Sequence, residues 1–134
     1  MTGNYQKEIQ TRLTRSLIDP IILQYLDKES MHGYQLITKI RKDFGIYLGP
    51  STVYPLLGRL EKKGYVKSEW NMNAYRPRKV YMLTAGGKNL LRLTEDSLNL
   101  ICKNLVRGAA LKVENRFAGL LLQESSRRVI VCQQ

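Results

Sequence analysis

The sequence predicts a mainly α-helical protein with a small β-hairpin, an α+β fold, on three observations. Apolar residues recur at helical spacing in successive segments before residue 64. The spacing changes to the two-residue alternation of strands between residues 66 and 83. Helical spacing then returns after Thr84. With 134 residues, of which 43% are hydrophobic, the chain is long enough to bury one core of ordinary size.

The first segment of the chain has two alternative interpretations. Residues 1–14 are mostly polar, with Tyr5, Ile9 and Leu13 at positions i, i+4 and i+8. This pattern suits a short helix that docks on a partner, and it equally suits a frayed terminus.

Two helices are expected next. Residues 16–27 have a broad apolar face, and Pro20 falls in the first turn, where proline is tolerated. Residues 28–32 interrupt the pattern. A second helix is expected over residues 33–44, and Gly45 should end it in a left-handed conformation.

The stretch from Leu48 to Val66 contains a third helix with two distinct faces. Its apolar residues fall at i, i+3, i+4 and i+7 and should form one buried stripe: Val53, Leu56, Leu57 and Leu60. The start signal of the helix consists of Gly49, Pro50 and Ser51, because proline suits the first turn and serine can accept a hydrogen bond from a free backbone N–H. Gly64 should end it.

The opposite face of this third helix is small, polar and basic. It carries Ser51, Thr52, Tyr54, Pro55, Gly58, Arg59 and Lys62. An ordinary amphipathic surface helix has the same pattern. The alternative is a recognition helix, whose outer face must enter the major groove of DNA without large side chains that hold it away. Two consecutive helices behind a supporting helix are the core of the helix-turn-helix plan, which favours the second alternative.

A β-hairpin is expected to follow and would be the wing of a winged helix. Its first strand begins at Val66, and its second strand covers residues 79–83. The tip between them carries three cations: Arg76, Arg78 and Lys79. A solvated loop readily explains one cation but explains three less well. Contact with DNA is therefore the favoured interpretation. Since Glu69 is the only acid in the hairpin, we expect that these cations are not all paired internally.

The charge of the chain is strongly positive and unevenly distributed. Its formal net charge is +11, from 22 basic and 11 acidic residues. Between Arg59 and Arg92 there are nine basic residues and only two acidic ones. This concentration predicts a polyanionic partner, first of all double-stranded DNA. A membrane surface would require a basic amphipathic helix with a bulky apolar face, whereas much of the excess charge lies in the hairpin.

The sequence does not support a metal site, a cofactor or a catalytic centre. Cys102 and Cys132 have no Cys or His at ligand spacing and are expected to be reduced thiols. No nucleophile with a base, paired carboxylates or phosphate-binding glycine loop is present. A lone histidine such as His32 is more often a cap or turn residue than a ligand, and Trp70 is more often a cross-strand packing partner than an effector-pocket residue. With no signal peptide and no apolar run near ~20 residues, the protein is expected in the cytoplasm.

A long C-terminal helix is expected over residues 87–106, with Thr84 as its N-cap. Its seam consists of Leu91, Leu98 and Leu105 at intervals of seven, flanked by Leu90, Ile101 and Cys102. We expect Leu91, Leu98, Ile101 and Leu105 to form a homodimer interface. The alternative is that the same stripe packs on the expected helix of residues 16–27 in its own chain, and both can hold at once.

The expected domain organisation is a DNA-binding region over residues 1–84 and a helical dimerisation region over residues 85–134. Gly108 should interrupt the C-terminal helix. The apolar segments at 120–122 and 129–131 remain unassigned by the sequence.

Four motifs together resemble the PadR family of transcriptional regulators. They are HGYQL (32–36), STVYPLLGRLEKKGYV (51–66), RPRK (76–79) and YMLTAGG (81–87). The resemblance covers roughly residues 17–91. It implies a winged-helix domain that binds operator DNA as a homodimer, usually as a repressor, and a C-terminal helix used for dimerisation. Ala85 and Gly86 depart from the family, which more often has acidic residues after the wing threonine.

The residues and the resemblance together predict a sequence-specific transcriptional regulator of duplex DNA. Its DNA contacts are expected from Ser51, Thr52, Tyr54, Pro55, Arg59, Lys62, Arg76, Arg78 and Lys79. Two alternatives stay open: an architectural protein that binds nucleic acid without sequence preference, and a protein-interaction module that no longer reads DNA. No residue pattern supports a small-molecule effector.

Overall fold

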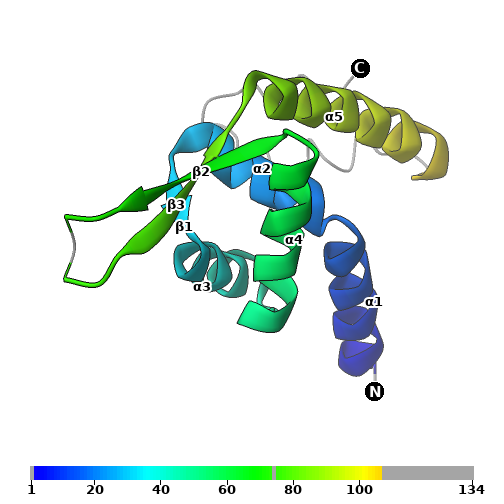
Figure 1. Cartoon of the computed structure of the whole chain (residues 1–134). Coiled ribbons are helices and arrows are strands. Elements are labelled where there is room, and N and C mark those ends of the chain that lie inside the picture. Colours follow the sequence, from blue (N-terminus) through cyan, green and yellow to red (C-terminus); the bar gives the residue numbers. More distant parts are fainter. Residues whose placement is uncertain (1, 74, 107–134) are drawn as a thin grey trace. The chain divides into compact units, whose positions relative to one another are not determined.

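The computed structural model describes residues 2–73 and 75–106 of the chain (Figure 1). In these two ranges the chain forms five helices and one three-stranded antiparallel sheet. The helices are α1 (Thr2–Ser16), α2 (Ile18–Lys28), α3 (Gly33–Phe44), α4 (Pro50–Lys62) and α5 (Ala85–Leu105). The strands are β1 (Met31–His32), β2 (Val66–Asn71) and β3 (Arg78–Leu83). The chain divides into two units, residues 1–91 and residues 92–134.

The first unit is a winged helix-turn-helix domain with one apolar core. Ile22 of α2, Leu36 of α3 and Leu57 of α4 are completely buried, and each lies on the apolar face that the sequence predicted for its helix. Burial of a side chain of this size contributes roughly 1.5–3 kcal/mol. Helices α3 and α4 follow one another across a short turn, and the β2–β3 hairpin, called the wing below (residues 66–83), projects beyond the helices (Figure 1).

The two glycine stops operate as the sequence predicted. Gly45 has a φ of 70° and ends α3 with its N–H bonded to the Arg41 carbonyl. Gly64 has a φ of 81°, and the next N–H, that of Tyr65, bonds to the Leu60 carbonyl at 2.9 Å. This second pattern is the Schellman motif, which satisfies the last carbonyls of α4 and turns the chain into the wing.

The start of α4 differs from the expectation in one detail. Pro50 is the first helical residue, as predicted, but Gly49 is the N-cap and no side chain caps the helix. The expected cap by Ser51 is therefore wrong, because Ser51 already lies inside the first turn. The backbone N–H groups of Thr52 and Val53 bond instead to the Gly49 carbonyl.

Strand β1 is the element that the sequence did not reveal. Residues 28–32 were expected only as a break, but Met31 pairs with Tyr81 and His32 pairs with Val80 of β3. The sheet order is β1-β3-β2, so the first strand of the wing occupies one edge and the segment before α3 occupies the other. A strand of two residues has no periodicity to detect.

Both flanking helices are present. Of the two alternatives for the first segment, the structure shows a helix, α1.

Helix α5 begins at Ala85, two residues earlier than predicted, with Thr84 as its cap. The Thr84 hydroxyl accepts a hydrogen bond from the Gly87 N–H at 3.0 Å. Gly87 must lack a side chain here, because a Cβ would lie 2.1 Å from the Tyr65 carbonyl oxygen. Leu91 is 6% exposed and belongs to the core.

Within the described residues, no helix has the length and apolar character needed to cross a membrane. The predicted interruption at Gly108, the apolar segments at 120–122 and 129–131, and Cys132 lie outside the described residues.

Candidate nucleic-acid interface

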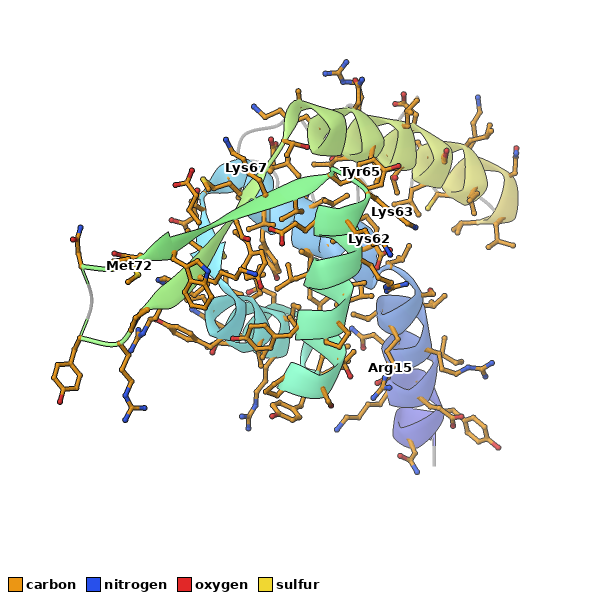
Figure 2. All side chains as sticks on the ribbon, viewed as in Figure 1. Arg15, Lys62, Lys63, Tyr65, Lys67 and Met72 are labelled. Atoms are coloured by element: carbon orange, nitrogen blue, oxygen red, sulfur yellow. The ribbon has the colours of Figure 1, made fainter. Side chains whose placement is uncertain are left out.

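The outer face of α4 is exposed, and much of it has no partner among residues 2–73 and 75–106. Ser51, Thr52, Pro55, Arg59 and Lys62 all point to solvent. Their side chains make no hydrogen bond or ion pair with the part of the chain that the structure describes. Lys62 lies at the C-terminal end of the helix (Figure 2), where a cation is favoured by the helix dipole. This face is therefore available to an external ligand.

Gly58 lies in the middle of the same face. No atom stands within 4 Å of the position that a Cβ would occupy there. The outer face of α4 is consequently recessed at Gly58, next to Arg59.

The wing cations have different surroundings. Arg78 donates a hydrogen bond from Nη1 to the Tyr34 hydroxyl at 2.8 Å, and its guanidinium lies 5.2 Å from the centre of the Tyr34 ring. Lys79 Nζ lies 5.7 Å from the centre of the Trp70 ring, its cross-strand partner. Arg76 is exposed and makes no such contact with the described residues.

Lys79 also has an acidic partner, which the sequence did not reveal. Its Nζ lies 3.9 Å from Oε1 of Glu61 in the last turn of α4. The other oxygen of Glu61 accepts a hydrogen bond from the Ser68 hydroxyl of β2. The expectation that the three wing cations are not all paired internally agrees with the described residues, but the acid that pairs with Lys79 is Glu61 of α4 and not the hairpin residue Glu69. Glu61 instead connects the recognition helix to both strands of the wing.

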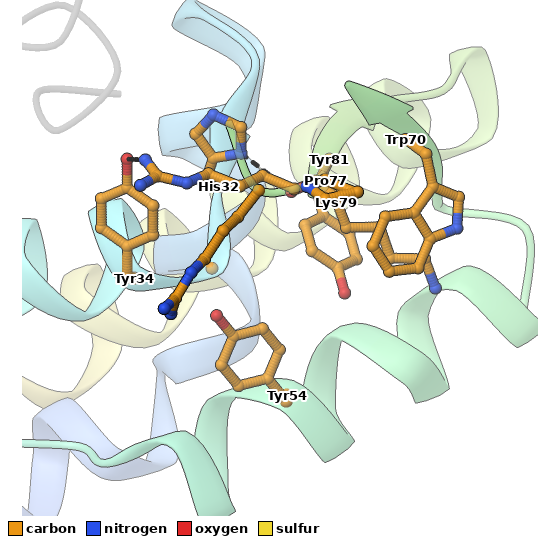
Figure 3. Close-up of a pocket in the computed structure, with 10 residues that line it drawn as sticks. His32, Tyr34, Tyr54, Trp70, Pro77, Lys79 and Tyr81 are labelled. Atoms are coloured by element: carbon orange, nitrogen blue, oxygen red, sulfur yellow. Dashed lines mark hydrogen bonds between the residues drawn. The ribbon is translucent and has the colours of Figure 1, made fainter. Parts of the chain in front are cut away.

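A cavity of about 640 Å³ lies between the start of α3, the outer face of α4 and the wing (Figure 3). Its aromatic walls are Tyr34, Tyr54, Trp70 and Tyr81. Its cations are Arg76, Arg78 and Lys79. None of the described residues that line it is acidic. The cavity thus brings three of the wing residues predicted from the sequence together with one from α4.

Two residues at the start of α3 shape this cavity. His32 is the N-cap of α3, as the sequence favoured, and its Nδ1 lies 3.0 Å from the Lys79 carbonyl oxygen. Since a carbonyl can only accept, Nδ1 carries the proton. Gly33 lets the Tyr54 ring lie against the helix, because a Cβ at position 33 would stand 2.5 Å from that ring.

Burial raises the pKa of two tyrosines, Tyr25 and Tyr81. Desolvation, followed by the Glu61 carboxylate and Tyr54, raises the pKa of Tyr81 above its ordinary value. Desolvation and a hydrogen bond from the Tyr25 hydroxyl to Asp43 at 2.6 Å likewise raise the pKa of Tyr25. A phenol is neutral near pH 7 even at its ordinary pKa, so Tyr81, which lines the cavity, carries no negative charge there.

Sequence reasoning missed Tyr34 as a member of this surface. Its available signal was modest: an aromatic residue with a hydroxyl on the outer face of α3, two residues after the N-cap. Its contact with Arg78 joins residues 44 positions apart, which spacing alone does not reveal.

The residues predicted for dimerisation have different degrees of exposure. Leu91 is buried in the core of the first unit, Leu98 is half-buried, and Ile101 and Leu105 are exposed, the latter by 79%. The alternative of packing within the chain therefore holds for Leu91.

Helix α1 exposes an apolar stripe. Tyr5, Ile9 and Leu13 are each more than half exposed and follow one another at intervals of four.

Comparisons with known proteins agree on one family. A family model described as the transcriptional regulator PadR-like family matches residues 22–93. The transcriptional regulator Rv3488 of Mycobacterium tuberculosis is 30% identical over 87 residues, which span 65% of this chain and 80% of that protein.

Solved structures give the same result. A PadR family transcriptional regulator from Eggerthella lenta is 28% identical with a TM-score of 0.68, and the match covers 92% of this chain and 97% of that one. One from Clostridium difficile is 30% identical with a TM-score of 0.59, covering 77% and 99% respectively.

Proposed function

Because this chain belongs to the PadR-like family of DNA-binding transcriptional regulators and is not an enzyme, we propose that it is a sequence-specific repressor. It binds an inverted-repeat operator in duplex DNA as a homodimer. The single observation that supports this most directly is the exposed outer face of α4. Its side chains Ser51, Thr52, Arg59 and Lys62 have no hydrogen-bond or ion-pair partner among the described residues.

The roles of the site residues follow from their positions. Ser51, Thr52, Tyr54, Pro55 and Arg59 share the face that enters the major groove and are assigned to base reading. Lys62 and the wing cations Arg76, Arg78 and Lys79 are assigned to the phosphate backbone, where contacts position the protein without reading sequence. Lys79 contributes least of these four, because Glu61 already lies 3.9 Å from its ammonium group.

Replacement of Arg59 tests the base-reading role. Arginine makes a bidentate contact with guanine through O6 and N7. We expect Arg59→Ala to weaken binding by ~1–3 kcal/mol and to relax the preference at one base pair. The measurement is titration of labelled duplexes that differ at single positions, after the preferred sequence has been selected from a random pool.

The outcome also separates the alternatives. A uniform loss across all sequences means that Arg59 holds only phosphate, and unchanged binding removes it from the interface. Steep salt dependence with no preferred sequence in the selection supports an architectural protein, whereas no duplex binding at low salt supports a protein-interaction module.

Dimerisation is proposed through the exposed part of the α5 seam, Leu98, Ile101 and Leu105, with help from the α1 stripe of Tyr5, Ile9 and Leu13. Both stripes present large apolar side chains at helical intervals, which is how one helix packs against another. Two-fold symmetry places two recognition helices about one DNA turn apart, ~34 Å, and requires an inverted-repeat operator.

Repression is the part of the proposal that binding alone does not test. It rests on the family resemblance, since a dimer on an operator that overlaps a promoter excludes the polymerase. Transcription in vitro from a promoter that carries the selected sequence should fall as protein is added. A rise in transcript would make the protein an activator.

A further inference from the structure

The cavity between α3, α4 and the wing contains an arginine that no carboxylate neutralises. Arg78 has no acidic partner among the described residues, and its one hydrogen bond there goes to the hydroxyl of Tyr34. A guanidinium has five N–H donors in a planar fork, so one such bond leaves the charge and most donors available. A phosphate oxygen pair is the ligand that this geometry fits best.

Arg78 is also held in place before any ligand arrives. The Tyr34 ring lies under the guanidinium at 5.2 Å, and the His32 ring stacks on Tyr34 at 5.4 Å with an interplanar angle of 7°. His32 in turn donates to the Lys79 carbonyl of β3. An arginine side chain normally loses conformational entropy when it binds a ligand. Because these contacts already restrict Arg78 in the free protein, less entropy is lost on binding.

Tyr54 supplies a second donor in the lining of the same cavity (Figure 3). It is 41% exposed, and its hydroxyl makes no hydrogen bond within residues 2–73 and 75–106. Its ring is fixed by the close approach at Gly33. A helix in the major groove lies between the two DNA backbones that border the groove, and this cavity lies on one flank of α4, between that helix and the wing.

We propose that Arg78 and the Tyr54 hydroxyl hold a single phosphodiester group of the operator in this cavity, and that Tyr34 is a positioning residue that orients the Arg78 guanidinium. The assignment rests on the proposed function and deepens it. It moves Tyr54 from base reading to backbone contact. It also gives the exposed hydroxyl of Tyr34 a role that does not require contact with DNA.

The first experiment is a double-mutant cycle in DNA binding. Tyr34→Phe keeps the ring and removes the hydroxyl, so it should weaken binding to the selected operator and to random duplex alike, by about five- to tenfold, with an unchanged salt slope. Arg78→Ala should lower the slope of log K against log salt by about 0.9. In the double variant the loss should equal that of Arg78→Ala alone, because Tyr34 acts through Arg78.

Tyr65→Phe is the matched control, since its hydroxyl has no hydrogen bond within the described part of the chain and lies outside the cavity lining. It should bind as the unsubstituted protein does. Losses from Tyr34→Phe and Arg78→Ala that simply add would overturn the positioning role. Equal melting temperatures of the variants establish that folding is not the cause.

The second experiment replaces the operator phosphates one at a time with uncharged methylphosphonate. In each half-site, replacement of one particular phosphate should weaken binding of the unsubstituted protein but cause no further loss with Arg78→Ala. The same replacement should cost Tyr54→Phe less affinity than it costs the unsubstituted protein. A scan with no such phosphate overturns the inference while the proposed function stands. Failure of the unsubstituted protein to bind any duplex overturns the proposed function itself.

The cavity could also bind a free anion in place of a DNA phosphate, and a third experiment distinguishes the two. Inorganic pyrophosphate is the probe, compared with sodium chloride at equal ionic strength. If the DNA assignment is right, the phosphate scan shows the phosphate coupled to Arg78, whether or not pyrophosphate also competes for the cavity. Saturable pyrophosphate binding that Arg78→Ala abolishes, together with a scan showing no coupled phosphate, would assign the cavity to a free anion instead.

Discussion

At the scale of single residues, Gly58 lowers the stability of α4, and no neighbouring atom in the described residues requires a glycine there. A glycine inside a helix is less favourable than alanine by about 0.5–1 kcal/mol, and here a Cβ would meet no atom within 4 Å. We therefore expect Gly58→Ala to raise the free energy of unfolding by about that amount. The same change should weaken duplex binding, because it raises the surface of α4 where the helix backbone approaches the base pairs. Urea denaturation and duplex titration measure the two effects.

Gly86 on α5 provides the matched control for Gly58. A Cβ there would make only ordinary contacts, the nearest at 3.5 Å from the Gly64 carbonyl oxygen. Gly86→Ala should leave DNA binding unchanged. If Gly58→Ala also binds DNA normally, α4 does not approach the groove closely at this position.

At the scale of elements, the wing should act mainly through charge. Arg76 and Arg78 lack acidic partners among the described residues, whereas Lys79 is paired with Glu61. Removal of both arginines by alanine should weaken specific and random duplexes alike. It should also flatten the plot of log K against log salt by roughly two units, about one for each phosphate that the variant no longer neutralises. Titrations at several salt concentrations measure this slope.

The control for the wing removes the same amount of charge elsewhere. Lys28 at the end of α2 and Lys88 in α5 are exposed and have no ion pair with described residues. The double variant Lys28→Ala/Lys88→Ala should lower affinity only slightly and keep the slope. An unaltered slope in the wing variant would mean that the wing points away from the DNA.

At the scale of the whole molecule, two recognition helices must act together. Aspartate at both Leu98 and Leu105 places charges in the proposed apolar seam, where burial without a partner is strongly unfavourable. We expect monomers that bind a full operator much more weakly than the unsubstituted protein and bind a half-site equally well. Sedimentation velocity gives the oligomeric state, and titration gives the two affinities.

Leu100 lies on the other side of α5 and is 61% exposed, so Leu100→Asp is the control for helix stability. It should remain a dimer. A dimer of undiminished affinity from the Leu98/Leu105 variant, or a monomer from Leu100→Asp, would place the interface on a different face of the helix.

The sequence by itself determined the elements whose signals are local. The apolar stripe of α4, its proline start and its glycine stop lie within a few residues of one another, and the switch to strand spacing follows at once. The same holds for the cap at Thr84. Such signals depend on the chain's own periodicity and turn chemistry, so the helix-turn-helix and the wing could be predicted with bounds correct to within two residues at most ends.

The tertiary structure alone decided which residues of those elements meet. The pairing of β1 with β3, the contact of Tyr34 with Arg78 and the ion pair of Glu61 with Lys79 each join separate elements. A two-residue strand carries no period, and a contact between residues 44 positions apart leaves no mark in the spacing of either segment. Packing of the buried faces brings these side chains together, and for that reason the cavity between α4 and the wing could not be derived from the sequence.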